Sequence, residues 1–152
     1  MIAVIQRVKE SSVVVDGAVV GRCAQGLMIL LGVAEGDDER DADVLAKKIS
    51  KLRIFSDEAG KMNLSVLDVG GEALVVSNFT LNANYKKGNR PDCLASAKPD
   101  VADRLYRLFT SLLAKCGVHT ETGIFGADME CRIVNDGPIT LVLDSKVLLG
   151  TK

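Results

Sequence analysis

The chain has 152 residues, a length that fits one domain, residues 1–152, with a single core. Its 19 Lys and Arg residues nearly balance its 20 Asp and Glu residues, which excludes a global positive field that gathers nucleic acid non-specifically, so any polyanion must be held locally. Hydrophobic residues make up 47% of the chain, and this surplus indicates a buried subunit interface.

The N-terminal stretch MIAVIQRVKE alternates apolar and polar residues and carries a charge by position 7. This pattern indicates neither a signal peptide nor a membrane span, so we expect a cytoplasmic protein with no membrane partner.

The next two segments predict β-structure. Asp16-Gly17 lies between two β-branched runs and predicts a hairpin with a type I′ turn. The apolar run GLMILLGVA predicts a strand that is buried on both faces.

Helical spacing appears next, in DDERDADVLAKKISKLR, where apolar residues recur along one face. We predict an amphipathic helix capped by Asp37 or Asp38, with the carboxylates of DDERDAD on its solvent face. Residues 53–67 are expected to form short extended pieces broken by the turn SDEAGK, and EALVVSNFTL to form a further central strand.

A polar loop over residues 82–97 precedes a second amphipathic helix, which Pro99 begins and Gly117 ends. VHTET, MECRIVN and ITLVLDS predict two or three closing strands. Because strands outnumber helices and come in hairpin-like groups, we predict an α+β fold. Its sheet is expected to be mostly antiparallel and barrel-like, with two main amphipathic helices.

Metal-binding and imidazole chemistry have little support in the composition. The four cysteines lie far apart without a CxxC pair, so we expect no metal site and no cofactor, and we interpret them as reduced and packed. They are Cys23, Cys93, Cys116 and Cys131. A catalytic arrangement with histidine could use only His119, in a strand-like run directly after a helix, where a partly buried structural histidine is favoured.

Two stretches carry the chemistry that remains. VVSNFTL ends an apolar strand with polar groups that are costly to bury unless they are paired, although hydroxyls bonded to backbone at a strand end would explain them. NDGPIT places Gly137-Pro138 where a strand is expected to begin. Proline within sheets is confined to edges, strand starts or bulges, and a plain turn would also use this dipeptide.

Five stretches resemble, in order and spacing, the D-aminoacyl-tRNA deacylase family. They are MIAVIQRVKESSVVVDG, KISKLRIFSDEAGKMNLSVLDVGGEALVVSNFTL, KKGNRP, TGIFGADM and NDGPIT. The resemblance covers nearly the whole chain. It implies a cytosolic homodimer that hydrolyses the ester joining a D-amino acid to tRNA, with the acceptor end of aminoacyl-tRNA as its partner and with no DNA partner.

The resemblance also implies the site. The family's Ser-Gln-Phe-Thr motif falls on four residues that we predict to be catalytic: Ser77, Asn78, Phe79 and Thr80. Its Gly-cis-Pro motif is inserted from one subunit into the active site of the other, where it leaves no room for an L side chain. The substrate-binding positions predicted from this motif are Gly137, Pro138, Asn135 and Thr140. Such a filter should accept many D-amino acids and also glycine mischarged on tRNA-Ala.

The hydrolytic step has alternatives. Thr80 is the obvious nucleophile, yet no likely base lies near it in the sequence. We favour the backbone N–H groups of Phe79 and Thr80 as an oxyanion hole, with the terminal adenosine's 2′-hydroxyl positioning or activating water, in line with the family's RNA-assisted mechanism. A small-molecule esterase using Thr80 or a cysteine, and a non-catalytic dimeric RNA-binding protein, remain as the rival hypotheses.

The sequence departs from the family at two places. Asn78 replaces the usual Gln, so a hydrogen bond to the substrate is expected to be lost or bridged by water. The family's Arg-Pro-Ser-Phe is here Arg90-Pro91-Asp92-Cys93, which removes an aromatic contact and adds an acid beside a basic cluster. Three residues of that cluster are predicted to bind tRNA phosphates, the alternative being a solvated loop: Lys86, Lys87 and Arg90.

Overall fold

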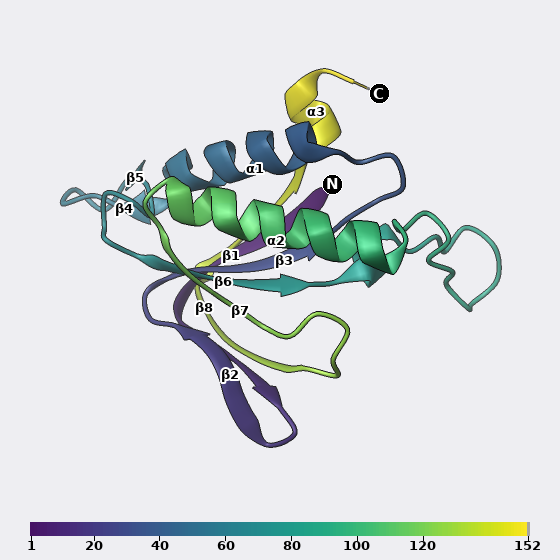
Figure 1. Cartoon of the computed structure of the whole chain (residues 1–152). Coiled ribbons are helices and arrows are strands. Elements are labelled where there is room, and N and C mark those ends of the chain that lie inside the picture. Colours follow the sequence, from purple (N-terminus) through teal and green to yellow (C-terminus); the bar gives the residue numbers. More distant parts are fainter. Residues whose placement is uncertain (152) are drawn as a thin grey trace.

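The structure is a computed structural model that describes residues 1–151. A six-stranded sheet forms its centre (Figure 1), with strands β1 (Ile2–Val15), β2 (Ala18–Cys23), β3 (Gly26–Gly32), β6 (Glu72–Ser77), β7 (His119–Thr122) and β8 (Glu130–Asp144). A separate two-stranded sheet contains β4 (Phe55–Ser56) and β5 (Met62–Leu64). The helical elements are α1 (Glu39–Lys51), the 3₁₀ turn η1 (Phe79–Asn82), α2 (Pro99–Lys115) and α3 (Ser145–Leu149).

The sheet is mixed. β1 pairs antiparallel with β2, β3 and β8, whereas β6 pairs parallel with β3 and β7. The parallel pairs follow from the connections, because α1 lies between β3 and β6 in the chain and α2 between β6 and β7, as crossovers require. The Arg22 backbone N–H donates to Glu121 Oε1 at 3.1 Å, which links β2 to β7 and nearly closes the sheet. The α+β, barrel-like prediction with two main helices is confirmed.

Packing follows the sequence pattern. The Asp16-Gly17 turn has positive φ at both residues, 49° and 79°, as the predicted type I′ hairpin requires. α1 and α2 lie side by side on one face of the sheet (Figure 1) and pack against β3, whose residues are all buried except the half-buried Leu30. A second cluster, formed mainly by β1, β3 and β6, lies within the curled part of the sheet: Val8, Val13, Cys23, Met28, Leu74 and Val76.

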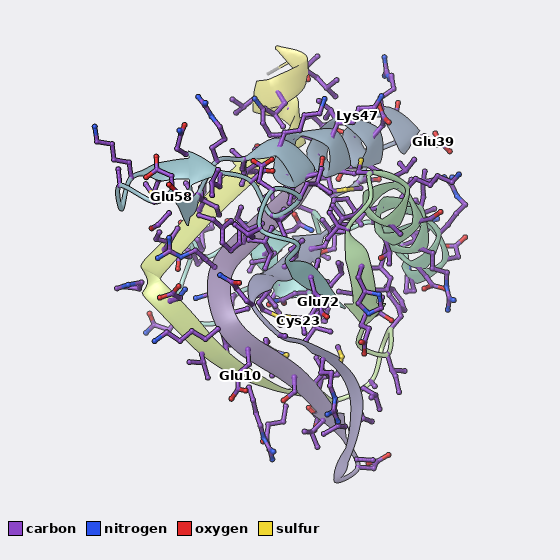
Figure 2. All side chains as sticks on the ribbon, turned by 90° about the vertical axis from the view of Figure 1, so that its left-hand side faces the viewer. Glu10, Cys23, Glu39, Lys47, Glu58 and Glu72 are labelled. Carbon is purple, nitrogen blue, oxygen red and sulfur yellow. The ribbon has the colours of Figure 1, made fainter. Side chains whose placement is uncertain are left out.

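The carboxylates at the start of α1 divide into two groups. Asp38 is the N-cap and forms a capping box, and Glu39 and Lys47 lie on the outer side of the helix (Figure 2). The expectation that DDERDAD faces solvent is wrong for Asp37 and Asp41, which are 7% and 1% exposed. They are buried because cations from both ends of the chain converge on them, as an isolated buried carboxylate would be unstable.

This buried ionic cluster joins β1, α1 and α3. The Met1 ammonium lies 2.8 Å from Asp37 Oδ2 and donates to Ser145 Oγ at 2.7 Å. Lys146 Nζ lies 2.9 Å from Asp41 Oδ1, and Ser145 Oγ donates to that same oxygen at 2.6 Å. Burial alone would raise the pKa of Asp41, but the hydrogen bonds from Lys146 and Ser145 outweigh burial and lower the pKa to about 2.

Four further differences separate the structure from the sequence predictions, three in the bounds or number of the elements and one in the exposure of His119. The strand predicted through residue 81 ends at Ser77, and η1 follows. The last two predicted strands are one strand, β8, and the sequence did not predict α3. His119 is exposed and pairs with Glu121 at 3.3 Å, so the partly buried role is wrong. Within residues 1–151, no helix is long and apolar enough to cross a membrane.

Candidate active site

The segment of residues 77–80 is positioned by the central strand that precedes it. Four consecutive residues of β6 are buried, and after Ser77 the Asn78 N–H donates to Leu31 O at 2.8 Å, the last hydrogen bond to β3. The chain then turns into η1, with Leu81 N–H donating to Asn78 O at 3.3 Å. Gly32 permits this approach, because a Cβ there would lie 2.9 Å from Leu81 Cβ. The core therefore fixes where the polar residues leave the sheet.

A cavity of about 570 Å³ lies beside this segment. Ser77, Asn78 and Phe79 line one part of it, and the rest comes from the sheet, the start of α2 and the 123–129 loop. The other lining residues are Leu30, Val33, Val76, Ser96, Ala97, Pro99, Ala102, Phe125, Gly126, Ala127, Met129 and Cys131. This lining contains no carboxylate, imidazole, ammonium or guanidinium group in the part of the chain that the structure describes.

Hydrogen bonds around the cavity leave η1's first N–H groups uncapped. Asn78 is the residue before η1, and its side chain makes no capping hydrogen bond; its Oδ1 instead accepts from the Thr80 hydroxyl. Ser96 Oγ donates to Phe79 O at 3.1 Å and ties η1 to the start of α2. The first N–H groups of a 3₁₀ turn have no intrahelical partner, so those of Phe79 and Thr80 remain available to a ligand.

Thr80 and the thiols offer little nucleophilic character. Thr80 is exposed and is not among the residues that line the cavity. Cys131 does line it, but burial raises the pKa of its thiol, which keeps it protonated. Cys23 lies in the second cluster near Glu72 (Figure 2), where burial, with the Glu72 charge, raises its pKa to about 12. Within residues 1–151, no group of three or more His, Cys, Asp or Glu side chains could hold a metal ion.

Gly137 and Pro138 lie in a bulge in the middle of β8. Gln6 pairs with Thr140 and Val8 with Asn135, so residues 136–139 of β8 all stand opposite Arg7 of β1. Four residues against one push the backbone out of the sheet, and Gly137 and Pro138 are both exposed. Their peptide bond is cis. This "136–139 bulge" explains how a strand can continue through a proline.

Side chains hold the bulge at its base. Asn135 Nδ2 donates to Arg7 O at 2.9 Å and to Ile139 O at 3.0 Å, which bridges β1 and both sides of the bulge. Arg7 Nε lies 3.2 Å from Asp136 Oδ2, and Arg7 Nη1 donates to Ile54 O at 2.8 Å. The Thr140 hydroxyl accepts from Gln6 Nε2 at 3.3 Å. Of the predicted substrate-binding residues, Asn135 therefore holds the bulge, whereas Thr140 lies beside it and makes only long contacts.

The two predicted motifs are far apart within one chain. Ser77 pairs with Leu31, Leu31 with Ala3, and Ala3 with Leu143, so β6 and β8 are separated by three strand spacings of about 4.8 Å. The bulge is also displaced along β1 from Ala3 to Arg7, four residues at about 3.4 Å each. The 77–80 segment and Gly137 are thus on the order of 20 Å apart across the sheet.

The basic loop, residues 83–95, leaves the body directly after η1, and it projects beyond the end of the sheet (Figure 1). The side chains predicted to bind tRNA are all exposed and form no ion pair with the described residues: Lys86, Lys87 and Arg90. Asp92, the acid that departs from the family, accepts from Asn84 Nδ2 and from the Leu94 N–H, both at 3.2 Å. The Asp92 carboxylate therefore stabilises the base of the loop through these two hydrogen bonds.

Comparison with known proteins gives one consistent result. The family model described as D-Tyr-tRNA(Tyr) deacylase matches residues 4–144. The chain belongs to this family. The D-aminoacyl-tRNA deacylase of Bacillus velezensis is 57% identical over 143 residues, covering 94% of this chain and 97% of that protein. The one from Geobacter metallireducens is 55% identical over 150 residues, covering 99% of both. The family and the hydrolase class predicted from the sequence are confirmed.

Solved structures agree on the fold of this deacylase family. A protein described as c-Myc DNA Unwinding Element Binding Protein is 38% identical, with a TM-score of 0.88 over 95% of this chain and 98% of that one. A probable eukaryotic D-amino acid tRNA deacylase is 16% identical, with a TM-score of 0.81 over 94% of this chain and 98% of that one. The second likeness shows the fold alone.

Sequence reasoning missed several residues of this site. Ser96, Phe125, Ala127 and Met129 line the cavity but were assigned no role, although TGIFGADM was among the stretches that resemble the deacylase family. Arg7, which faces the bulge, lies in the N-terminal stretch that also resembles it. The signal that could have indicated these residues was their position inside long stretches that resemble the family. Residue spacing could not have indicated Arg7, because no spacing rule connects it to residue 136.

Proposed function

We propose that the chain acts as a homodimer, each protomer a single domain, that hydrolyses the ester of D-aminoacyl-tRNA and of glycyl-tRNA mischarged on tRNA-Ala. The carrying observation is the cavity beside residues 77–80, which has hydrogen-bonding backbone at one end and no charged side chain in its lining. A site of this kind suits polarisation of an ester carbonyl by N–H groups, and it offers no side-chain base. We place the enzyme in the cytoplasm, with no DNA or membrane partner.

In the proposed reaction, the carbonyl oxygen of the ester accepts hydrogen bonds from the Phe79 and Thr80 N–H groups. Water attacks the carbonyl carbon, positioned or activated by the 2′-hydroxyl of the terminal adenosine. The C–O bond to the ribose then breaks, the amino acid leaves as a carboxylic acid and the tRNA recovers its hydroxyl. A preformed donor pair of this type contributes about 2.7–4 kcal/mol per donor to transition-state stabilisation.

Chiral selection is proposed to come from the partner subunit. The 136–139 bulge is too far from its own cavity to contact a substrate there, whereas it protrudes from β8, whose one strand partner among the described residues is β1. Apolar residues on β8 near the bulge support a contact between copies, because they are exposed in the single chain: Val134 by 44%, Leu141 by 38% and Val142 by 70%. In the dimer, Gly137-Pro138 of one protomer would close the cavity of its partner and leave no space for an L side chain.

Complementation between two defective variants tests this arrangement. Gly137→Ala disables the bulge, and Ala127→Phe fills the cavity from the 123–129 loop. A mixed dimer then contains one site built from an intact cavity and an intact bulge, so refolding the two variants together should restore up to about half of the wild-type activity per mixed dimer. Each variant refolded alone is the control. No recovery in dimers shown to be mixed, or full activity in a wild-type monomer, contradicts the cross-subunit site.

Rival functions are separated by the substrate. An esterase that uses Thr80 or a cysteine would hydrolyse D-amino-acid esters without RNA and would be sensitive to thiol reagents in the second case. A non-catalytic RNA-binding protein would bind tRNA without releasing amino acid. A cysteine nucleophile is disfavoured because burial raises the pKa of Cys131, and a threonine nucleophile is disfavoured because Thr80 does not line the cavity. Release of D-tyrosine, but not L-tyrosine, from matched tyrosyl-tRNAs is the expected result.

A further inference from the structure

The basic loop exposes two apolar side chains that its own fold does not use. Tyr85 is 80% exposed and Leu94 is 86% exposed, and both line a cavity of about 580 Å³, called the outer cavity below, which is formed by residues 83–86, 92, 94 and 95. Lys86 lines the same cavity. Apolar surface left in water forgoes the free energy of burial, so a paired aromatic and aliphatic side chain at one hollow indicates a ligand with a flat apolar face.

The base of the loop is ordered. Asn84 and Asp92 exchange two backbone hydrogen bonds, Asn84 N–H to Asp92 O at 2.7 Å and Asp92 N–H to Asn84 O at 3.0 Å. Asn84 Oδ1 also accepts from the Lys86 N–H at 3.2 Å. These bonds fix the backbone on both sides of Tyr85, so the ring is presented with less conformational entropy to lose on binding.

The two cavities are neighbours along the chain at both ends of the loop. Ser96 lines the cavity beside residues 77–80, and Ala95, directly before it, lines the outer cavity. At the other end, η1 follows Asn78 and leads to Ala83, which also lines the outer cavity. The residues that line the two cavities are therefore contiguous in the chain, so a polymer whose end occupies the first cavity can extend to the second.

Charge identifies the polymer. Lys86 lines the outer cavity, and Lys87 and Arg90 are exposed in the same loop; none of the three forms an ion pair among the described residues, in a chain whose net charge is −1. Asp92 also lines the cavity, but its carboxylate accepts hydrogen bonds from Asn84 Nδ2 and the Leu94 N–H. Local cations beside an exposed aromatic ring are the combination that binds single-stranded nucleic acid, with bases stacked on the ring and phosphates at the cations. An apolar peptide would need no such cations.

We propose that Tyr85 and Leu94 form a base-binding platform for the unpaired 3′ end of the tRNA. It takes a nucleotide upstream of the esterified adenosine, while Lys86 and Lys87 contact the neighbouring phosphates. This inference rests on the proposed function, because it requires the adenosine end to occupy the first cavity. Stacking is worth about 1–3 kcal/mol per base and tolerates any base, so the platform adds affinity for the RNA without selecting the amino acid.

The first experiment separates binding of the RNA from the chemistry. Tyr85→Ala should raise KM for D-aminoacyl-tRNA about 5- to 150-fold at unchanged kcat, the range that one stacked base gives, whereas Tyr85→Phe should behave as wild type. On the D-aminoacyl ester of adenosine alone, all three proteins should react alike. The matched control is Val147→Ala on α3, an equally peripheral apolar residue that is 77% exposed.

Inhibition by RNA fragments that carry no amino acid tests the platform independently. The trinucleotide CCA should inhibit the wild type more strongly than adenosine does, and this advantage should disappear in Tyr85→Ala. A wild-type KM for tRNA in Tyr85→Ala, or an equal loss on aminoacyl-adenosine, overturns the platform. Both readouts use a D-substrate only, so a failure of chiral selection, which would refute the cross-subunit filter, leaves them unaffected.

Salt dependence tests the phosphate contacts. Lys86→Gln should reduce the slope of log KM against log salt by about 0.7, the value for one phosphate contact on a single strand. Lys61→Gln removes the same charge from the exposed turn between β4 and β5 and should leave the slope unchanged. Equal slopes in Lys86→Gln and the wild type would contradict the assignment of that lysine.

Discussion

The 77–80 segment and the 136–139 bulge are held in place by different forces. The first follows β6, four residues of which are buried between two parallel neighbours, so hydrophobic packing fixes its position. The second interrupts β8, which within residues 1–151 pairs with a strand on one side only, and it is held by polar contacts from Asn135 and Arg7. Packing energy is spread over many atomic contacts, whereas the bulge depends on a few hydrogen bonds and ion pairs. A single substitution can remove a large part of those polar contacts, so we expect the bulge to be more sensitive to substitution than the 77–80 segment.

Gly137→Ala should produce the largest effect. Gly137 has φ of +125°, and a Cβ there would lie 2.9 Å from both Ile139 N and Ile139 Cγ1. The bulge must therefore shift or the substituent must enter the space proposed for the substrate, and we expect D-aminoacyl-tRNA hydrolysis to fall about 100-fold or more, roughly 2.7 kcal/mol in the activation barrier. Steady-state kinetics on D-tyrosyl-tRNA measure this.

The matched control is Gly60→Ala, in the turn between β4 and β5. Gly60 has φ of +76°, yet no atom of the described residues lies within 4 Å of an added Cβ. Gly60→Ala therefore introduces the same kind of backbone strain as Gly137→Ala but no steric clash. It should lose some stability in urea unfolding and keep its activity. If Gly137→Ala is no more impaired than Gly60→Ala, the bulge does not enter a site.

The same contrast explains what the sequence could predict. Periodicity located β3, α1 and α2 because their burial repeats along the chain, and the Asp16-Gly17 turn has a local signature. Family motifs supplied residues 77–80 and Gly137-Pro138. The continuity of β8 could not be predicted from the sequence, because it depends on a hydrogen bond from Asn135 to Arg7, which lies 128 residues earlier in the chain. Asp37 and Asp41 were misplaced since their cationic partners come from both ends of the chain.

Asn135→Ala should give the next largest effect, because it loosens the bulge without altering its backbone. It removes two donated hydrogen bonds and leaves the carbonyls of Arg7 and Ile139 without that partner, at a cost of about 1–3 kcal/mol. We expect D-substrate hydrolysis to fall about 5- to 100-fold, with more L-tyrosyl-tRNA cleaved. Rates for both enantiomers, with urea unfolding alongside, measure the two consequences.

Thr140→Val is the control for Asn135→Ala. The Thr140 hydroxyl makes only long contacts, 3.3 Å with Gln6 and 3.5 Å with Asn135, so its loss should cost less than about 1 kcal/mol and leave the enantiomer ratio unchanged. An enantiomer ratio that stays at the wild-type value in Asn135→Ala, despite lowered stability, would show that the bulge is not held by this side chain.

The buried ionic cluster secures the other end of the same β1 and β8 pair, and pH tests it. Asp41 has a folded pKa of about 2 against 3.8 for the free side chain, so its ionised form favours folding. The contribution, about 2 kcal/mol, is fully present above pH 4 and is lost as pH falls from there through 2. Urea unfolding between pH 7 and 2 should show wild type losing stability across this window.

Asp41→Asn should lack that part of the pH dependence, so its stability deficit relative to wild type should shrink towards pH 2. At neutral pH the variant should retain the wild-type enantiomer ratio, because the cluster lies at Met1 and Ser145, away from the bulge. A deficit that is constant from pH 7 to 2 would rule out the ionised Asp41 as the stabilising form.

The smallest effect is expected within the packed half of the site. Thr80→Ala removes a hydroxyl that donates to Asn78 Oδ1 at the exposed start of η1 and does not line the cavity. Since alanine keeps the backbone N–H that the proposed oxyanion hole uses, the variant should keep hydrolysis within about 10-fold of wild type, the loss of one modest hydrogen bond.

The complementary substrate is D-aminoacyl-tRNA ending in 2′-deoxyadenosine with the amino acid on the 3′-oxygen. It should be cleaved far more slowly by wild type and variant alike, because the proposed water lacks the neighbouring hydroxyl. Abolished turnover in Thr80→Ala, together with normal cleavage of the deoxy substrate, would instead identify Thr80 as the nucleophile and leave the 2′-hydroxyl without a role.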